Sequence, residues 1–155
     1  SDDMLDVDSP PSITGDSATL SMWCKADSVS DWISPHGYCT SSFDDFRLTW
    51  RKHNTNNLSA YARYTNGRQS TSGWSYTNDL REWNHYTVVA DAGDVIFYVN
   101  AELVSTGTGG TGNLNLGTTF TLGSRDGSGV GVWNGKIASV QIYNRAITAD
   151  EVLQN

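Results

Sequence analysis

Short runs in which apolar and polar residues alternate recur along the chain and limit what it can fold into. Residues 18–26 (ATLSMWCKA), 46–52 (FRLTWRK) and 57–65 (NLSAYARYT) each alternate between two faces. This period of two predicts strands with one face in a core. Four further runs have the composition of strands and are separated by Gly, Asn and Asp clusters: 85–91, 94–107, 119–124 and 136–144.

Strands at this spacing, without helical periods between them, predict an all-β fold. We expect a two-sheet antiparallel jelly-roll sandwich that ends in one short C-terminal helical turn. Thr148 and Glu151 have the spacing of a capping box, which would open a turn over residues 149–154. The 155 residues suit one domain over residues 1–155, and we expect that domain to be part of a longer protein.

Charge and hydropathy narrow the classes of partner. The net charge of −7 at pH 7 disfavours nucleic acid and anionic membranes as partners. No apolar run approaches the roughly 18 residues of a membrane span, so we expect no membrane insertion. The two cysteines, Cys24 and Cys39, leave a disulfide and a pair of buried thiols as alternatives.

The acidic residues do not form a catalytic pattern. Glycoside hydrolysis needs two carboxyl groups at a fixed separation, and no predicted strand carries acids at i and i+2 or i+4. The three glutamates lie in apparent turns or in the terminal helix: Glu82, Glu102 and Glu151. Tyr61, Arg63 and His53 could supply the residue types of a polysaccharide lyase, but without recognisable motifs. We therefore predict no catalytic residues and a protein that is not an enzyme, with lyase or hydrolase activity as a weak alternative.

Tryptophans are abundant, with six in the chain. Trp23 and Trp50 lie in predicted strands and are expected in the core. Trp32, Trp74 and Trp133 lie in predicted loops, where they either form exposed platforms for sugar rings or anchor the loops.

Several cationic residues gather on the predicted hairpin of residues 46–65. Its non-core face brings together Arg47, Arg51, Tyr61 and Arg63 in an otherwise acidic chain. Guanidinium groups match carboxylates and sulfates in a bidentate fork, so this face could bind an acidic polysaccharide. Alternatively, the arginine side chains cover the apolar sheet and pair with scattered aspartates.

Longer segments carry a family resemblance. Residues 81–107 (REWNHYTVVADAGDVIFYVNAELVSTG), 120–152 (FTLGSRDGSGVGVWNGKIASVQIYNRAITADEV) and 4–28 resemble laminin-G-like domains of the concanavalin A-like lectin/glucanase superfamily, with a pentraxin-like jelly roll. That superfamily hosts lectins, binding modules, adhesion domains and glycanases, so the resemblance is specific for fold and weak for function. It places Trp83 in the core and gives His85 a structural role.

One departure from the family concerns a hairpin turn. The family usually has Asn-Gly where this chain has Asn100 and Ala101. If the turn needs a positive φ at the second residue, alanine costs on the order of 1 kcal/mol there.

The resemblance to pentraxin-type lectins also implies a calcium site. Asp44 and Asp45 stand where those lectins hold calcium before a strand of the middle hairpin, and Asp126 stands where the second ligand group lies. Arg125 could replace the ion and pair with Asp44 or Asp45. Three alternatives stay open for these aspartates: calcium, an Arg–Asp pair, and turn residues without a ligand.

These observations together predict a non-catalytic carbohydrate-binding, lectin-like module. It would recognise polysaccharide or glycoprotein glycan through rim loops, with calcium at the rim as one of the open alternatives, and would contact neighbouring domains of a parent protein. We expect it at an extracellular, cell-surface or virion location. The alternative is a structural or adhesive spacer with no small ligand. The ligand-binding residues predicted in the loops and on the hairpin are Trp32, Trp74, Trp133, Arg125, Tyr61, Arg47 and Arg63.

Overall fold

The fold is described from a computed structural model of the chain. It describes residues 5–7, 9, 11–28, 33–39, 46–52, 56–71, 74–75, 80–116, 119–124 and 132–155. For residues 6, 33–39, 46–52, 56–57 and 74–75 it describes the backbone alone.

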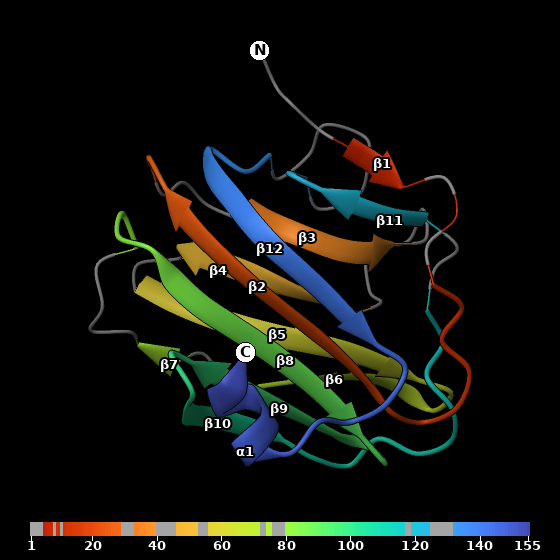
Figure 1. The fold of residues 1–155 in the computed structure, drawn as a ribbon. Coiled ribbons are helices and arrows are strands. Elements are labelled where there is room, and N and C mark those ends of the chain that lie inside the picture. The colour runs from red at the N-terminus through yellow and green to blue at the C-terminus, as the bar shows by residue number, and fades with distance from the viewer. Residues whose placement is uncertain are drawn as a thin grey trace.

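Two antiparallel sheets face each other as a sandwich, which confirms the predicted jelly-roll class (Figure 1). The seven-stranded sheet has the order β1-β11-β3-β4-β5-β6, with β7 paired to β5. Its strands are β1 (Leu5–Val7), β3 (Ile33–Cys39), β4 (Phe46–Lys52), β5 (Asn56–Tyr64), β6 (Gly67–Ser70), β7 (Trp74–Ser75) and β11 (Thr119–Leu122). The five-stranded sheet has the order β10-β9-β8-β2-β12. Its strands are β2 (Ala18–Ala26), β8 (Asn84–Asp91), β9 (Asp94–Val99), β10 (Glu102–Gly107) and β12 (Gly135–Tyr143).

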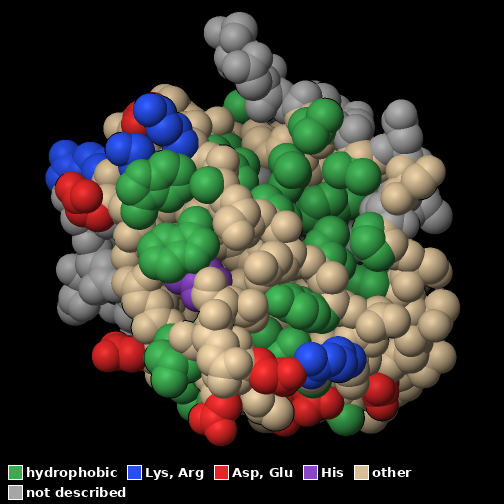
Figure 2. Space-filling model, in the orientation of Figure 1, with side chains coloured by type: hydrophobic (Ala, Val, Ile, Leu, Met, Phe, Trp, Pro, Cys, Tyr) green, Lys and Arg blue, Asp and Glu red, His purple; other side chains and the backbone are tan. Residues whose placement is uncertain are grey.

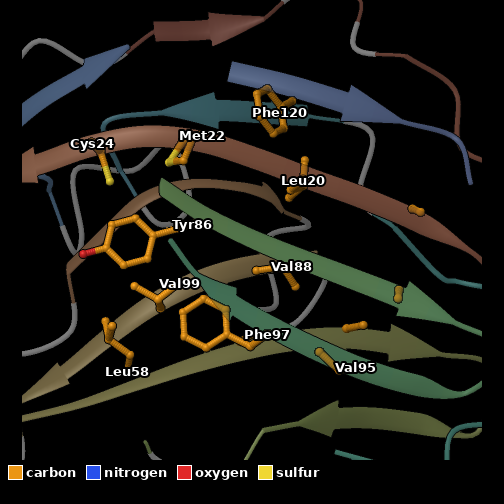
Figure 3. Packing of buried hydrophobic residues seen from close by; sticks show 14 of the residues in the cluster. Leu20, Met22, Cys24, Leu58, Tyr86, Val88, Val95, Phe97, Val99 and Phe120 are labelled. Atoms are coloured by element: carbon orange, nitrogen blue, oxygen red, sulfur yellow. The ribbon is translucent and has the colours of Figure 1, made fainter. Parts of the chain in front are cut away.

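The core lies between the sheets and follows the predicted alternation. Leu20, Met22 and Cys24 of β2 are fully buried and face the other sheet (Figure 3). From the opposite side, β5 contributes Leu58, Ala60 and Ala62, while Ser59, Tyr61 and Arg63 lie on its outer face. Figure 3 shows the aromatic rings of Tyr86, Phe97 and Phe120 in the same layer.

Cys24 carries a free thiol inside this core. The disulfide alternative is therefore wrong for Cys24. Its burial raises the pKa of the thiol, so the group stays neutral among apolar neighbours.

The chain ends in the predicted helical turn, α1 (Ala149–Gln154), which lies on the outer face of the five-stranded sheet (Figure 1). The capping box is confirmed, because Thr148 Oγ1 accepts from the Glu151 amide and the Glu151 carboxylate accepts from the Thr148 amide. A second apolar cluster seats this segment on the sheet: Val89, Tyr98, Ile147 and Val152. Within the part of the chain that the structure describes, no helix has the length and apolar character of a membrane span.

The hairpin between β9 and β10 turns through Asn100 and Ala101, which have φ values of 50° and 65°. The expected strain at Ala101 is thus present. Asn100 also ties the turn to the start of β8, since its Oδ1 accepts from the His85 amide at 2.9 Å. Its Nδ2 donates to Asn84 Oδ1 at 2.9 Å.

Candidate functional site

Most of the residues predicted to bind a ligand or calcium in loops lie outside the described residues. They are Trp32, Asp44, Asp45, Arg125 and Asp126. The calcium site, the Arg–Asp pair and the ligand-free turn therefore stay predictions. Among the residues that are described, no group of three His, Cys, Asp or Glu side chains is placed to hold a metal ion.

Two other predicted residues are located by their backbone. Trp74 lies in β7, opposite Leu58 of β5. Arg47 lies in β4, opposite Tyr61 of β5. The side chains of both lie outside the description.

The outer face of the seven-stranded sheet brings Tyr61, Arg63 and Arg68 together. Arg63 of β5 is directly opposite Arg68 of β6, and Tyr61 lies two residues before Arg63 on the same face. The Arg68 guanidinium carbon is 5.1 Å from the centroid of the Tyr61 ring, within the range of a cation–π contact. The Tyr61 ring is 6% exposed, whereas Arg68 is exposed. We call these three residues the arginine–tyrosine surface.

The arginine–tyrosine surface concentrates positive charge. Like charges directly opposite each other on neighbouring strands destabilise a sheet unless an anion, from the protein or from a ligand, lies near them. Arg63 and Arg68 are paired in the register of the two strands, and guanidinium groups suit a carboxylate or a sulfate. The structure thus places Tyr61 and Arg63, two of the predicted ligand-binding residues, on one surface.

Arg68 was missing from the predicted site, although the sequence contains a signal for it. Asn66 and Gly67 form the Asn-Gly dipeptide typical of tight hairpins, and here β5 and β6 pair across this turn. Applied to residues 56–70, this rule predicts a hairpin that brings Arg68 next to the strand before it, with Thr65 opposite Arg68. The turn lies one residue earlier, at Thr65 and Asn66, and therefore pairs Arg68 with Arg63.

The prediction that Trp133 forms an exposed platform is wrong. Its side chain is 7% exposed and belongs to the core cluster. Its amide donates to the Gly123 carbonyl at 2.7 Å, which draws the segment before β12 against β11 and turns the indole inward. Trp133 thus anchors the loop, which was the alternative role considered for it.

The core assignments of Trp23 and Trp83 are also wrong. Trp23 is 36% exposed and Trp83 is 42% exposed. Trp23 projects from the outer face of β2, and α1 does not extend over that part of the sheet. Figure 2 shows large hydrophobic side chains on this face, around the histidine and beside basic groups.

His85 has the predicted structural role. Its ring is 5% exposed, stacks on Trp23 and hydrogen-bonds through Nε2 to Ser21 Oγ at 2.6 Å. Burial lowers the pKa of His85, because the charged imidazolium loses its hydration there.

Comparisons with known proteins agree with this architecture. A protein-family model described as the concanavalin A-like lectin/glucanases superfamily matches residues 1–153. No curated protein gives a significant sequence match.

Three solved structures share the fold. One is domain 4 of AbnA, a GH43 extracellular arabinanase from Geobacillus stearothermophilus, in complex with arabinotriose. It is 16% identical, with a TM-score of 0.68, and the match covers 92% of this chain and 67% of that chain. A native heptameric SAP-like pentraxin from Limulus polyphemus is 18% identical, with a TM-score of 0.70. The match covers 91% of this chain and 70% of the pentraxin chain. The CBM40 of the Ruminococcus gnavus IT-sialidase, bound to α2,3-sialyllactose, is 16% identical with a TM-score of 0.69 over 97% of both chains. At these identities the likeness is one of fold.

Proposed function

Because this chain belongs to the concanavalin A-like lectin/glucanases superfamily, we propose that it is a non-catalytic carbohydrate-binding module for acidic glycans. The family membership was predicted from residues 81–107 and 120–152. Polysaccharide or glycoprotein glycan on an extracellular, cell-surface or virion-borne partner is the ligand class that we propose.

The observation that carries the proposal is the arrangement of the arginine–tyrosine surface. Arg63 and Arg68 stand opposite each other in a chain whose net charge is −7, so this part of the sheet departs in sign from the whole molecule. A uronate or sialate carboxylate, or a sulfate ester, would accept hydrogen bonds from both guanidinium groups. Tyr61, beneath Arg68, holds that guanidinium in place by the cation–π contact.

The comparisons support a glycan as the ligand. A domain of similar fold, the CBM40 of the Ruminococcus gnavus sialidase, is bound to sialyllactose, which carries a carboxylate. A second, from the Geobacillus arabinanase, is in complex with arabinotriose.

The positions of the glutamates support a non-catalytic role. Glu82 precedes β8, Glu102 begins β10, and Glu151 lies in α1, where Arg145 pairs with it at 2.6 Å. Glycoside hydrolysis requires two carboxyl groups at a fixed separation, and Glu151 is engaged by Arg145 rather than free to act as one of them.

Affinity electrophoresis tests the proposal. We expect the protein to be retarded in gels that contain alginate, polygalacturonate or hyaluronan, and the retardation to weaken as salt is added because the contacts are ionic. Arg63→Ala and Arg68→Ala should each weaken retention by about tenfold, since a hydrogen bond to a charged group contributes roughly 1.5–3 kcal/mol.

Arg145→Ala is the matched control, because it removes one exposed arginine far from this surface. Its retention should equal that of the wild type. If neither Arg63→Ala nor Arg68→Ala changes retention, the arginine–tyrosine surface is not the binding site. If no glycan retards the wild type, the spacer alternative replaces the proposed function.

A further inference from the structure

We propose that the outer face of the five-stranded sheet carries a second binding site for acidic glycan. It is formed by Trp23, Trp83, Lys25 and Lys136, which we call the tryptophan surface. The proposal takes its ligand class from the proposed function, but its evidence comes from other residues on the opposite side of the sandwich.

Trp23 provides a fixed aromatic platform. One face of its indole stacks on the His85 ring, with centroids 5.2 Å apart and an interplanar angle of 24°. Because His85 is buried beneath it, the exposed third of Trp23 is the side turned to solvent. A partly exposed aromatic ring can stack on the apolar C–H face of a pyranose.

The layer beneath Trp23 is rigidly held, so this platform is formed before a ligand arrives. Ser21 Oγ contacts both His85 Nε2 at 2.6 Å and Thr87 Oγ1 at 3.1 Å. The His85 backbone is fixed by Asn100, which accepts from its amide and donates to its carbonyl. A preorganised ring loses little conformational entropy on binding.

Trp83 and Lys25 extend the surface beyond Trp23. Lys25 lies two residues after Trp23 on the same face of β2, and its Nζ is 5.8 Å from the centroid of the Trp83 ring. This contact fixes the ammonium group beside both indoles. Figure 2 shows basic and hydrophobic side chains gathered on this face.

The register of the sheet adds a second ammonium group. Lys136 of β12 is directly opposite Lys25 of β2. A pair of like charges at this position destabilises a sheet, and a bridging anion removes the repulsion.

Two observations on this face together argue for a ligand. A partly exposed indole is stacked on His85, and a cross-strand pair of lysines lies beside a second indole. On the tryptophan surface, a sugar ring would stack on Trp23 while its carboxylate or sulfate meets Lys25 and Lys136. Asp27 follows Lys25 by two residues, and Arg81 and Glu82 precede Trp83, so three basic residues and two acidic residues belong to these segments.

The two surfaces lie on the outer faces of different sheets, so one short oligosaccharide cannot reach both. The wild type should therefore bind two oligosaccharides per chain. Isothermal titration calorimetry with alginate, polygalacturonate and hyaluronan oligosaccharides measures this stoichiometry. Methyl-esterified oligogalacturonate, which keeps the sugar rings and lacks the charge, should bind about tenfold more weakly.

Variants assign the second site. We expect two variants to reduce the stoichiometry from two oligosaccharides per chain to one: Trp23→Ala and the double variant Lys25→Ala/Lys136→Ala. Trp23→Phe keeps an aromatic ring and should still bind two oligosaccharides per chain. The lysine variant leaves the Trp23–His85 stack intact, so it tests the site even if Trp23→Ala lowers stability. Leu103→Ala, which removes an apolar side chain that is 60% exposed on β10, is the control and should bind two.

The outcomes separate this proposal from the proposed function. One bound oligosaccharide per wild-type chain, lost on Arg68→Ala and unaffected by Trp23→Ala, would overturn the second site and leave the proposed function standing. A stoichiometry that stays at two in both tryptophan-surface variants would also overturn it. Absence of binding to every acidic probe would overturn both.

Discussion

At the scale of single residues, two alanines stand in backbone conformations that suit glycine or asparagine. Ala92 has a φ of 46° and Ala101 a φ of 65°, each in a two-residue hairpin turn of the five-stranded sheet. Left-handed backbone brings Cβ close to the following carbonyl oxygen. Ala101 therefore weakens a turn whose other member, Asn100, is fixed by hydrogen bonds to Asn84 and His85.

Replacing Ala101 with glycine tests this strain. We expect Ala101→Gly to raise the free energy of unfolding by about 1 kcal/mol, because glycine adopts a positive φ without a steric penalty. Urea denaturation measures the change. Ala138→Gly in β12, where φ is not positive, is the control and should lower stability by about 0.5–1 kcal/mol. If Ala101→Gly and Ala138→Gly lower the free energy of unfolding by the same amount, the backbone at Ala101 is not strained.

At the scale of elements, α1 depends on a small polar network at its start. Glu151 accepts from the Thr148 amide at 2.8 Å and binds Arg145 through both carboxylate oxygens, at 2.6 and 2.9 Å. The hydrogen bond from Arg145 is the main cause that lowers the pKa of Glu151 from 4.5 to about 2. The same network lines an open cavity of about 190 Å³ between β12 and α1.

This pKa shift predicts how the helix responds to acid. Because the folded pKa of Glu151 is below its ordinary value, its stabilisation is present above about pH 4.5 and is lost as the pH falls toward 2. Glu151→Gln should lower the thermal midpoint at neutral pH. Between pH 4.5 and pH 2, the thermal midpoint of this variant should fall less than that of the wild type. Glu102→Gln, on the exposed edge of β10, should behave as the wild type. If the thermal midpoint of Glu151→Gln falls with pH as much as that of the wild type, the ion pair with Arg145 does not cause the acid sensitivity.

At the scale of the whole molecule, charge is distributed unevenly. The net charge of −7 repels acidic polymers, so attraction depends on the two cationic surfaces, one on each sheet. Their placement on opposite sides of the sandwich has a consequence for long ligands. If both proposed sites bind glycan, one protein molecule holds two polysaccharide chains at once.

We therefore expect the wild type to cross-link long alginate or polygalacturonate chains. Turbidity or light scattering should rise with added protein at low salt and fall when excess short oligosaccharide competes. Trp23→Ala and Arg68→Ala should each bind without cross-linking, because each keeps one surface. If light scattering of the polysaccharide does not rise when wild-type protein is added, the protein does not bind through two separate surfaces.

The sequence by itself determined the sandwich, the core face of its strands and the helix cap. Alternation with a period of two assigned Leu20, Met22 and Cys24 to one face, and local spacing identified the capping box at Thr148. These features depend only on residues that are close together in the sequence, so the sequence pattern is sufficient to predict them. The strain at Ala101 was expected from the family resemblance, because the related domains usually have glycine at that position of the turn.

Only the tertiary structure decided what covers the outer faces. Thr19 and Trp23 lie on the same outer face of β2, yet Thr19 is fully buried while Trp23 is 36% exposed. The difference arises because the segment before α1 lies on Thr19, whose hydroxyl donates to the Arg145 carbonyl at 2.9 Å. Alternation separates two faces but does not show which segment, more than 100 residues away, will cover part of a face, so it could not show that Trp23 stays partly exposed. Trp83 was placed in the core by the family resemblance alone, and whether the loop residue Trp133 turns inward depends on the contacts of its segment with Gly123.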